Sequence, residues 1–82
     1  MANQPHIFLF SVHRESMDAA VRAFAAEWPH ARVSNLLDDS LFAWVREAGG
    51  VVPEMYEVFR DLTRHMIGRG ADGILFTCSA FR

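Results

Sequence analysis

The chain has 82 residues, of which 51% are hydrophobic and 22% charged, which is typical of one small globular domain and excludes a disordered segment. Eight arginines stand against ten carboxylates, and no run of like charge predicts a nucleic-acid stripe or a polybasic membrane anchor. A single cysteine excludes an internal disulfide, and with no leader peptide or membrane-length apolar run we expect a protein of the reducing cytoplasm.

The first predicted element is a strand over residues 6–12, HIFLFSV. Its continuous apolar run is typical of a strand covered on both faces, so we place it at the centre of a sheet. Ser11 then lies at the carboxyl end, where open α/β sheets bind ligands, and is either a pocket hydroxyl or a plain strand-end residue. His13 follows as either an acid/base partner of the cysteine or a solvated loop residue.

A helix is predicted next, with Ser16 as its cap and Asp18 in its first turn. Apolar residues at helical spacing form one stripe along it and Pro29 ends it: Met17, Ala20, Val21, Phe24, Ala25 and Trp28. Residues 31–37 mix polar and apolar side chains, which favours a strand at the sheet edge. The turn over residues 38–40 follows, where Asp39 and Ser40 either cap the next helix or contact a substrate.

A short helix is predicted from Leu41 to Ala48, ended by two glycines, and a longer one begins at Pro53. The apolar face of the longer helix comprises Met55, Val58, Phe59, Leu62 and Met66. By the same periodicity we assign the tryptophans, Tyr56 and all phenylalanines except Phe81 mainly to the core. Residues 68–73 fit G-x-G-x-x-G, but they end a helix and open a strand, so they predict a tight turn and not a dinucleotide site.

The last strand, from Gly73, runs into Thr77 and Cys78 and is predicted to be a buried parallel strand. The order β-α-β-α-α-β predicts one α/β domain over residues 1–82, a three-layer open parallel sheet of order 2-1-3 with helices on both faces. Cys78 is then either a small buried hydrophobe or a reactive thiol at a helix amino terminus, where the dipole lowers a thiol pKa. In the second case, N–H groups with the Thr77 and Ser79 hydroxyls would hold a carboxylate or enolate oxygen.

Three segments together resemble the amino-terminal half of the aspartate/glutamate/hydantoin racemase superfamily: ADGILFTCSAF (71–81), NLLDDSL (35–41) and REAGG (46–50). The resemblance implies an isomerase without pyridoxal phosphate or metal, built from two α/β lobes that each supply one cysteine. One cysteine removes a proton next to a carboxylate, and the other returns a proton to the opposite face. Cys78 corresponds to the cysteine of the first lobe.

The resemblance also has departures that bear on the substrate. Ser79 stands where amino-acid racemases of the group commonly carry Asn, and residues 11–14 replace the Asn-Pro-Asn-Thr-like turn of hydantoin racemases. Because inversion needs an acid and a base on opposite sides of the carbon, one cysteine is insufficient. We therefore expect a truncated first lobe that acts on a small carboxylate in the family but is inert as a monomer.

Two function classes stay open at this point. The first is the lobe of a cysteine-dependent isomerase with a small-molecule carboxylate substrate, no cofactor and no nucleic-acid or membrane partner. The second is a non-enzymatic remnant or interaction module, whose last strand would be an apolar sheet edge that favours self-association. Two copies pairing so that their Cys78 thiols meet would join the two classes.

Overall fold

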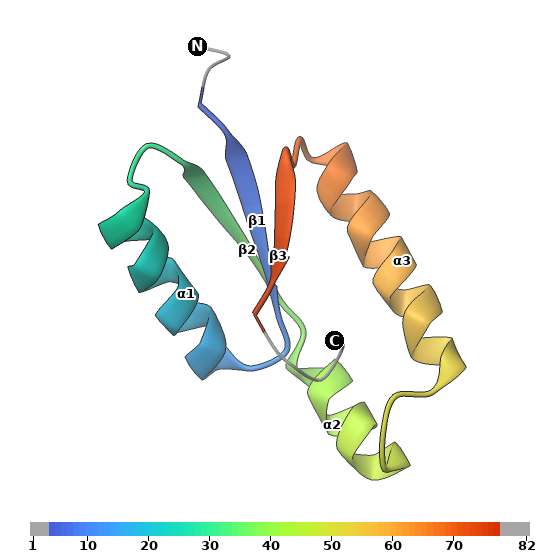
Figure 1. Cartoon of the computed structure of the whole chain (residues 1–82). Coiled ribbons are helices and arrows are strands. Elements are labelled where there is room, and N and C mark those ends of the chain that lie inside the picture. Colours follow the sequence, from blue (N-terminus) through green and yellow to red (C-terminus); the bar gives the residue numbers. More distant parts are fainter. Residues whose placement is uncertain (1–3, 78–82) are drawn as a thin grey trace.

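The computed structural model describes residues 4–77, so the predictions on Cys78, Ser79 and Phe81 lie outside the described residues. The described residues form three strands and three helices in the order β-α-β-α-α-β (Figure 1). In order they are β1 (His6–Ser11), α1 (Arg14–Glu27), β2 (Arg32–Leu37), α2 (Asp39–Ala48), α3 (Pro53–Gly68) and β3 (Gly73–Phe76).

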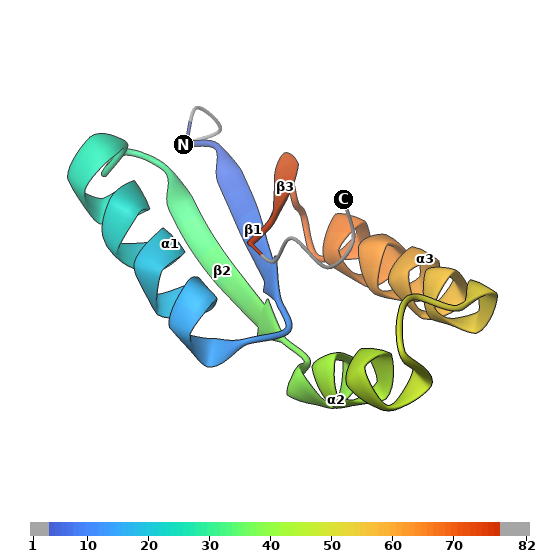
Figure 2. The same cartoon turned by 60° about the horizontal axis from the view of Figure 1, so that its bottom comes forward.

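The strands form one parallel sheet in the order β2-β1-β3, and Figure 2 shows β1 between its two neighbours. In the register, Phe10 of β1 lies opposite Leu36 of β2 and Phe76 of β3. The α/β fold, the parallel pairing and the 2-1-3 order predicted from the sequence are confirmed. The crossovers of this order bring all three carboxyl ends to one edge of the sheet.

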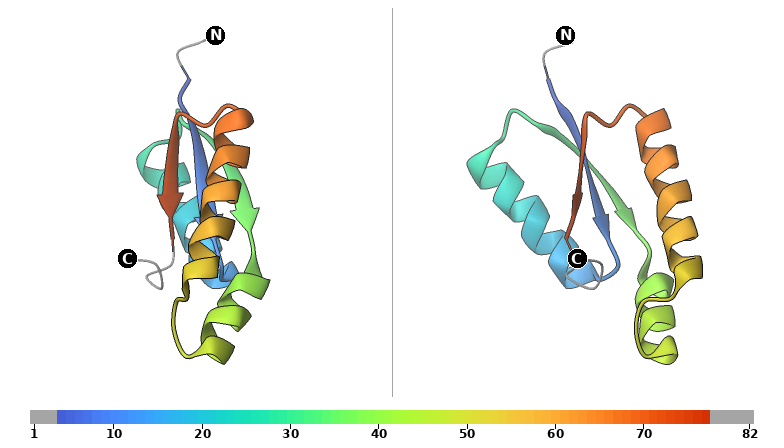
Figure 3. Two further views of the ribbon diagram at one scale, coloured as in Figure 1. Left: turned by 90° about the vertical axis from the view of Figure 1, so that its right-hand side faces the viewer. Right: turned by 45° about the vertical axis from the view of Figure 1, so that its right-hand side comes forward.

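The hydrophobic core lies mainly between the sheet and the helices α2 and α3. Figure 3 shows α3 in front of the sheet and α1 behind it. Alternate residues of β1 and its extension face α2 and α3, because side chains along a strand point to opposite faces in turn. The buried core cluster comprises Phe8, Phe10, Val12, Leu41, Met55 and Met66. The rings of Phe10, Phe59 and Phe76 join β1, α3 and β3, with centroids 5.2–5.6 Å apart.

The α1 side of the sheet is packed less tightly than the sequence predicts. No α1 residue is buried, and residues of α1, β2 and the turn between them line a groove of about 270 Å³. Trp28 lies at the cap position beyond α1, 44% exposed, and stacks on Phe24 with ring centroids 6.1 Å apart. The core assignment was also wrong for Tyr56, 56% exposed, and Phe76, 45% exposed. Periodicity identifies an apolar face, but it does not say whether a three-stranded sheet is wide enough to cover that face.

The start of α1 also differs from the prediction. The helix begins at Arg14 with His13 at the cap position, so Ser16 lies within the first turn and Glu15, not Asp18, is the acidic residue of that turn. The caps of α2 agree better with the sequence, since Asp38 accepts a hydrogen bond from the Leu41 amide and Gly49 adopts the left-handed conformation. Pro53 opens α3 as predicted.

The amino end of the sheet carries a buried polar contact that the sequence does not reveal. His6 is 7% exposed, and its Nε2 lies 2.7 Å from Ser34 Oγ on β2. Its backbone N–H donates to Asp72 Oδ2 at 2.8 Å, while the Asp72 amide donates to the His6 carbonyl at 2.7 Å. These bonds fix the turn before β3 to the first residue of β1, which gives His6 a structural role.

Candidate functional site

Polar side chains gather at the carboxyl edge of the sheet, where all three strands end. The sheet pairing extends there by one residue on each side of β1. The Thr77 amide donates to the Phe10 carbonyl at 3.0 Å, and the Asp38 amide donates to the Ser11 carbonyl at 2.8 Å. The backbone therefore holds Thr77 in a fixed place beside the end of β1, immediately before Cys78 in the sequence.

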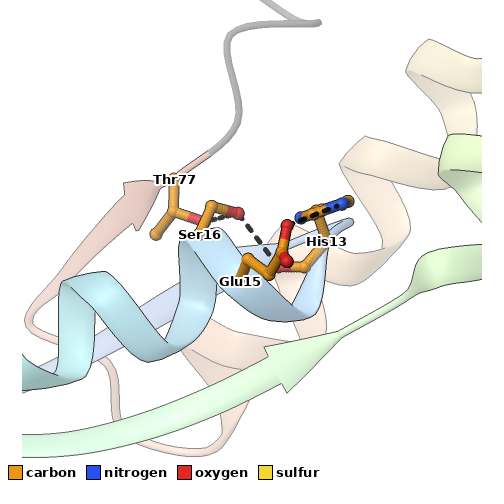
Figure 4. A network of polar contacts seen from close by, with 4 residues as sticks. All are labelled: His13, Glu15, Ser16 and Thr77. Carbon is orange, nitrogen blue, oxygen red and sulfur yellow. Dashed lines mark hydrogen bonds and ion pairs between the residues drawn. The ribbon is translucent and has the colours of Figure 1, made fainter.

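A chain of three hydroxyls crosses this edge. Ser11 Oγ lies 2.6 Å from Thr77 Oγ1, which donates to Ser16 Oγ at 3.2 Å. The Ser16 hydroxyl in turn donates to the His13 carbonyl at 2.9 Å. Figure 4 shows Thr77 at the end of β3 turned toward Ser16 on α1. Residues from two strands and one helix thus share one hydrogen-bonded chain.

The direction of donation along this chain follows from its last member. A carbonyl oxygen only accepts, so the Ser16 hydrogen is used on His13 and Ser16 accepts from Thr77. Since the Thr77 hydrogen is then used as well, Ser11 must be the donor to Thr77. All three hydroxyl hydrogens are therefore donated within the protein, and in this arrangement the three oxygens can only accept further hydrogen bonds. A carboxylate at this edge would take its hydrogen bonds from backbone N–H groups or from a rotated hydroxyl.

Ser11 and Thr77 are thus the two predicted substrate-binding residues that the structure brings together. Ser11 is fully buried at 0% exposure, and Thr77 and Ser16 are half-buried. Whether these hydroxyls contact a substrate remains a prediction. Ser16 is the residue that the sequence interpretation missed, because it was assigned as a helix cap. Ser16 lies three residues after His13, and a serine at this spacing in the first turn of a helix can donate its hydroxyl hydrogen to the earlier carbonyl.

Ser40, the third described member of the predicted site, lies apart from the hydroxyl chain. Its hydroxyl donates to Asp38 Oδ1 at 2.5 Å, and the same oxygen accepts from the Leu41 amide at 3.2 Å. Ser40 thus supports the carboxylate that caps α2, in agreement with the capping alternative. Ser40 and Asp39 are both exposed.

His13 stands at the same end of the sheet and has neighbours of its own. Its Nε2 lies 3.6 Å from Glu15 Oε1, and its ring packs edge-on against Phe42 with centroids 5.5 Å apart. The side chain is 42% exposed. The contact with Glu15 orients the ring away from the hydroxyl chain (Figure 4), so an acid/base role for His13 stays a prediction that the described contacts do not require.

Two further searches concern residues 4–77. Within that range no three side chains of His, Cys, Asp or Glu are arranged to hold a metal ion. No helix of the described part combines the length and the apolar character needed to cross a membrane. The catalytic position predicted at Cys78 and its neighbour Ser79 fall outside the described residues, so the structure locates the residue before them and not the thiol.

Comparison with known proteins gives no relative from which a function can be transferred: no family model, no curated protein and no solved structure matches the chain.

Proposed function

We propose that this chain is the cysteine-bearing lobe of a cofactor-independent isomerase of the racemase type, acting on a small carboxylate. The observation that carries the proposal is the fixation of Thr77 from two sides. Its amide bonds to the Phe10 carbonyl, and its hydroxyl lies between those of Ser11 and Ser16. The residue before the cysteine is thereby anchored at the carboxyl edge of a parallel sheet, and folds of this class commonly carry their sites at that edge.

The proposed step is a proton transfer at carbon. The Cys78 thiolate removes the proton next to the carboxylate: the C–H bond breaks, an S–H bond forms, and the electron pair moves into the enolate of the substrate. Backbone N–H groups at the same edge stabilise the enolate oxygen. Inversion requires a second acid on the other face of the carbon. In the superfamily that the chain resembles, this acid is a second cysteine. The chain has one cysteine, so we propose that the acid comes from another polypeptide and that these 82 residues do not racemise a substrate by themselves.

Substrate protection of the thiol tests this proposal. Because the chain has one cysteine, alkylation by iodoacetamide reports on Cys78 without ambiguity. The alkylation rate is to be measured with and without a panel of small carboxylates, including aspartate, glutamate and unsubstituted dicarboxylates. We expect at least one carboxylate to slow alkylation in a saturable way, whereas its amide analogue does not. Equal rates with every member of the panel would contradict a carboxylate site at Cys78.

The second candidate function is a non-enzymatic interaction module that keeps the same fold. The exposure of Leu75 (44%) and Phe76 (45%) on β3 favours it, because an apolar edge strand is a surface for pairing. The two candidates predict different behaviour of the Cys78 thiol. In an interaction module no carboxylate is expected to slow the alkylation of Cys78, and association depends on β3. The alkylation assay therefore separates them, since only the isomerase lobe requires a carboxylate to protect Cys78.

A further inference from the structure

The outer edge of β3 offers backbone groups for a further strand. β3 pairs with β1 on one side, and within residues 4–77 no strand pairs with its other side. The Thr77 amide bonds toward β1. Since backbone groups alternate in direction along a strand, Ile74 and Phe76 turn their N–H and C=O groups to the outer edge. Such an edge is a template for pairing with another chain.

A groove runs beside this edge on the α3 side of the sheet. It has a volume of about 390 Å³ and is lined by Tyr56, Phe59, Arg60, Thr63 and Phe76. Three of these residues, Tyr56, Arg60 and Thr63, lie in one row along α3 at helical spacing, and Ile67 extends the row by one turn. We call residues 56, 60, 63 and 67 the α3 stripe; its two ends are Tyr56 and Ile67. Both ends are large and more than half exposed, at 56% and 59%. Two exposed apolar residues, Tyr56 and Ile67, thus end a stripe that carries Arg60 and Thr63 between them, and the groove joins this stripe to Phe76 of β3.

Four charged residues on and beside the α3 stripe form a pattern that matches itself when the helix is reversed. Glu57, Arg60, Asp61 and Arg64 are all exposed, on the outer side of α3. If a second α3 runs antiparallel about a point between residues 60 and 61, Glu57 faces Arg64 of the second copy. Arg60 then faces Asp61 of the second copy. Every acid meets a base, so the pattern fits a second copy of this same helix in the opposite direction.

An antiparallel pair of β3 strands and an antiparallel pair of α3 helices would have their two-fold centres at nearly the same height along the sheet. An antiparallel pair of β3 strands in which Ile74 meets Phe76 is centred on Leu75. Phe76 lies level with Phe59, since their rings pack 5.2 Å apart. Leu75 precedes Phe76 by one strand residue, or about 3.3 Å. Because α3 runs opposite to β3, this distance corresponds to a step of roughly two residues forward along α3 from Phe59. That point is near Asp61, where the charge pattern also has its centre.

We propose that two copies of this chain pair through β3 and the α3 stripe, about a two-fold axis perpendicular to the sheet. The two β3 strands run antiparallel and make one six-stranded sheet, while both α3 helices lie on the same face. Residues 56, 60, 63 and 67 of one copy contact the same stripe of the other, as an isologous interface requires. Tyr56 of one copy then lies toward the Ile67 end of the stripe of the second copy.

This dimer is independent of the proposed isomerase chemistry. In the antiparallel register each Thr77 lies opposite residue 73 of the second copy. The two Thr77 residues are therefore about 13 Å apart along the sheet, four strand residues at about 3.3 Å each. The carboxyl edges of the two sheets stay separate, and Cys78→Ser is expected to leave the dimer unchanged.

Charge exchange on α3 tests the dimer. Sedimentation equilibrium over a concentration series, in reducing buffer, is to be measured for the native chain, Glu57→Arg, Arg64→Glu and the double variant. We expect a native dimer, a dissociation constant raised about tenfold in each single variant because like charges meet twice across the axis, and recovery in the double variant. Glu47→Arg, an exposed site on α2 with the same change of charge, is the control and leaves the dissociation constant unchanged.

Three results would overturn the inference. The first is a native chain that stays monomeric across the series. The second is a double variant as weak as its single parents, which would mean that the two residues do not face each other. The third is a Glu47→Arg effect equal to that of Glu57→Arg, which would show that net charge and not this surface governs association. Circular dichroism of each variant shows that it is folded; all the exchanged residues are exposed, so we expect native spectra.

Discussion

Ser11 Oγ and Thr77 Oγ1 lie 2.6 Å apart, although 66 residues separate them in the chain. Ser11 ends β1 and is fully buried, and Thr77 follows β3. The contact joins two strand ends at the edge where a parallel sheet binds ligands, and it does so at the residue before the chain's one cysteine. Because Ser11 is the donor, the two partners are not equivalent, and this asymmetry can be measured.

Thr77→Val is expected to destabilise the fold more than Ser11→Ala. The valine leaves the buried Ser11 hydroxyl without an acceptor, at a cost of about 1–3 kcal/mol in the free energy of unfolding, whereas loss of the Ser11 donor costs about 1 kcal/mol. Urea unfolding followed by circular dichroism measures both. The double variant should cost less than the sum, since removing both partners leaves nothing unsatisfied. A larger cost for Ser11→Ala would show that the hydroxyls donate in the other direction.

Large-to-small substitutions should show that the core lies mainly on the α2 and α3 side. Met66→Ala removes a fully buried side chain from the core cluster and is expected to cost about 2–5 kcal/mol, enough to unfold much of a domain this small. Val21→Ala, on the apolar stripe of α1 and 36% exposed, should cost less than about 1 kcal/mol. Thermal unfolding of the two variants compares them. Equal costs would mean that α1 is packed as tightly as α3.

The cap of α2 should depend on Asp38 and not on its neighbours. Asp38→Ala removes the acceptor of the Leu41 amide and is expected to cost about 1 kcal/mol. Ser40 is exposed, so Ser40→Ala removes a solvent-accessible donor to Asp38 and should cost less than about 0.5 kcal/mol. The two are to be compared by urea unfolding. If Ser40→Ala costs as much as Asp38→Ala, the hydroxyl does more than support the cap.

The arrangement of the fold could be predicted because its signals are local and consistent. The apolar run of β1, Pro53 at the start of α3 and the glycine after α2 each specify an element or its end, and the crossovers then favour the parallel 2-1-3 sheet. The exposure of Trp28 could not be predicted, because helical spacing gives the face of a helix and not the width of the sheet beneath it.

The candidate site could be predicted only in part. Ser11 and Thr77 were identified because both come at strand ends, and parallel strands end together. Ser16 was assigned to the wrong role, because a helix start shifted by three residues changes a capping hydroxyl into one that bonds Thr77. The buried pairing of His6 with Ser34 gave no signal in the sequence, since it depends on the register between β1 and β2.

The pH dependence of Cys78 alkylation tests the proposed chemistry most directly. Iodoacetamide rates are to be measured from pH 5 to 10 on the folded chain and on the same chain in urea, where the thiol titrates near its ordinary pKa of about 8.5. If the sheet edge activates the thiolate, the midpoint for the folded chain lies at least about one pH unit below that of the unfolded chain. A folded midpoint equal to the unfolded one, or above it, would contradict a reactive cysteine and with it the isomerase proposal.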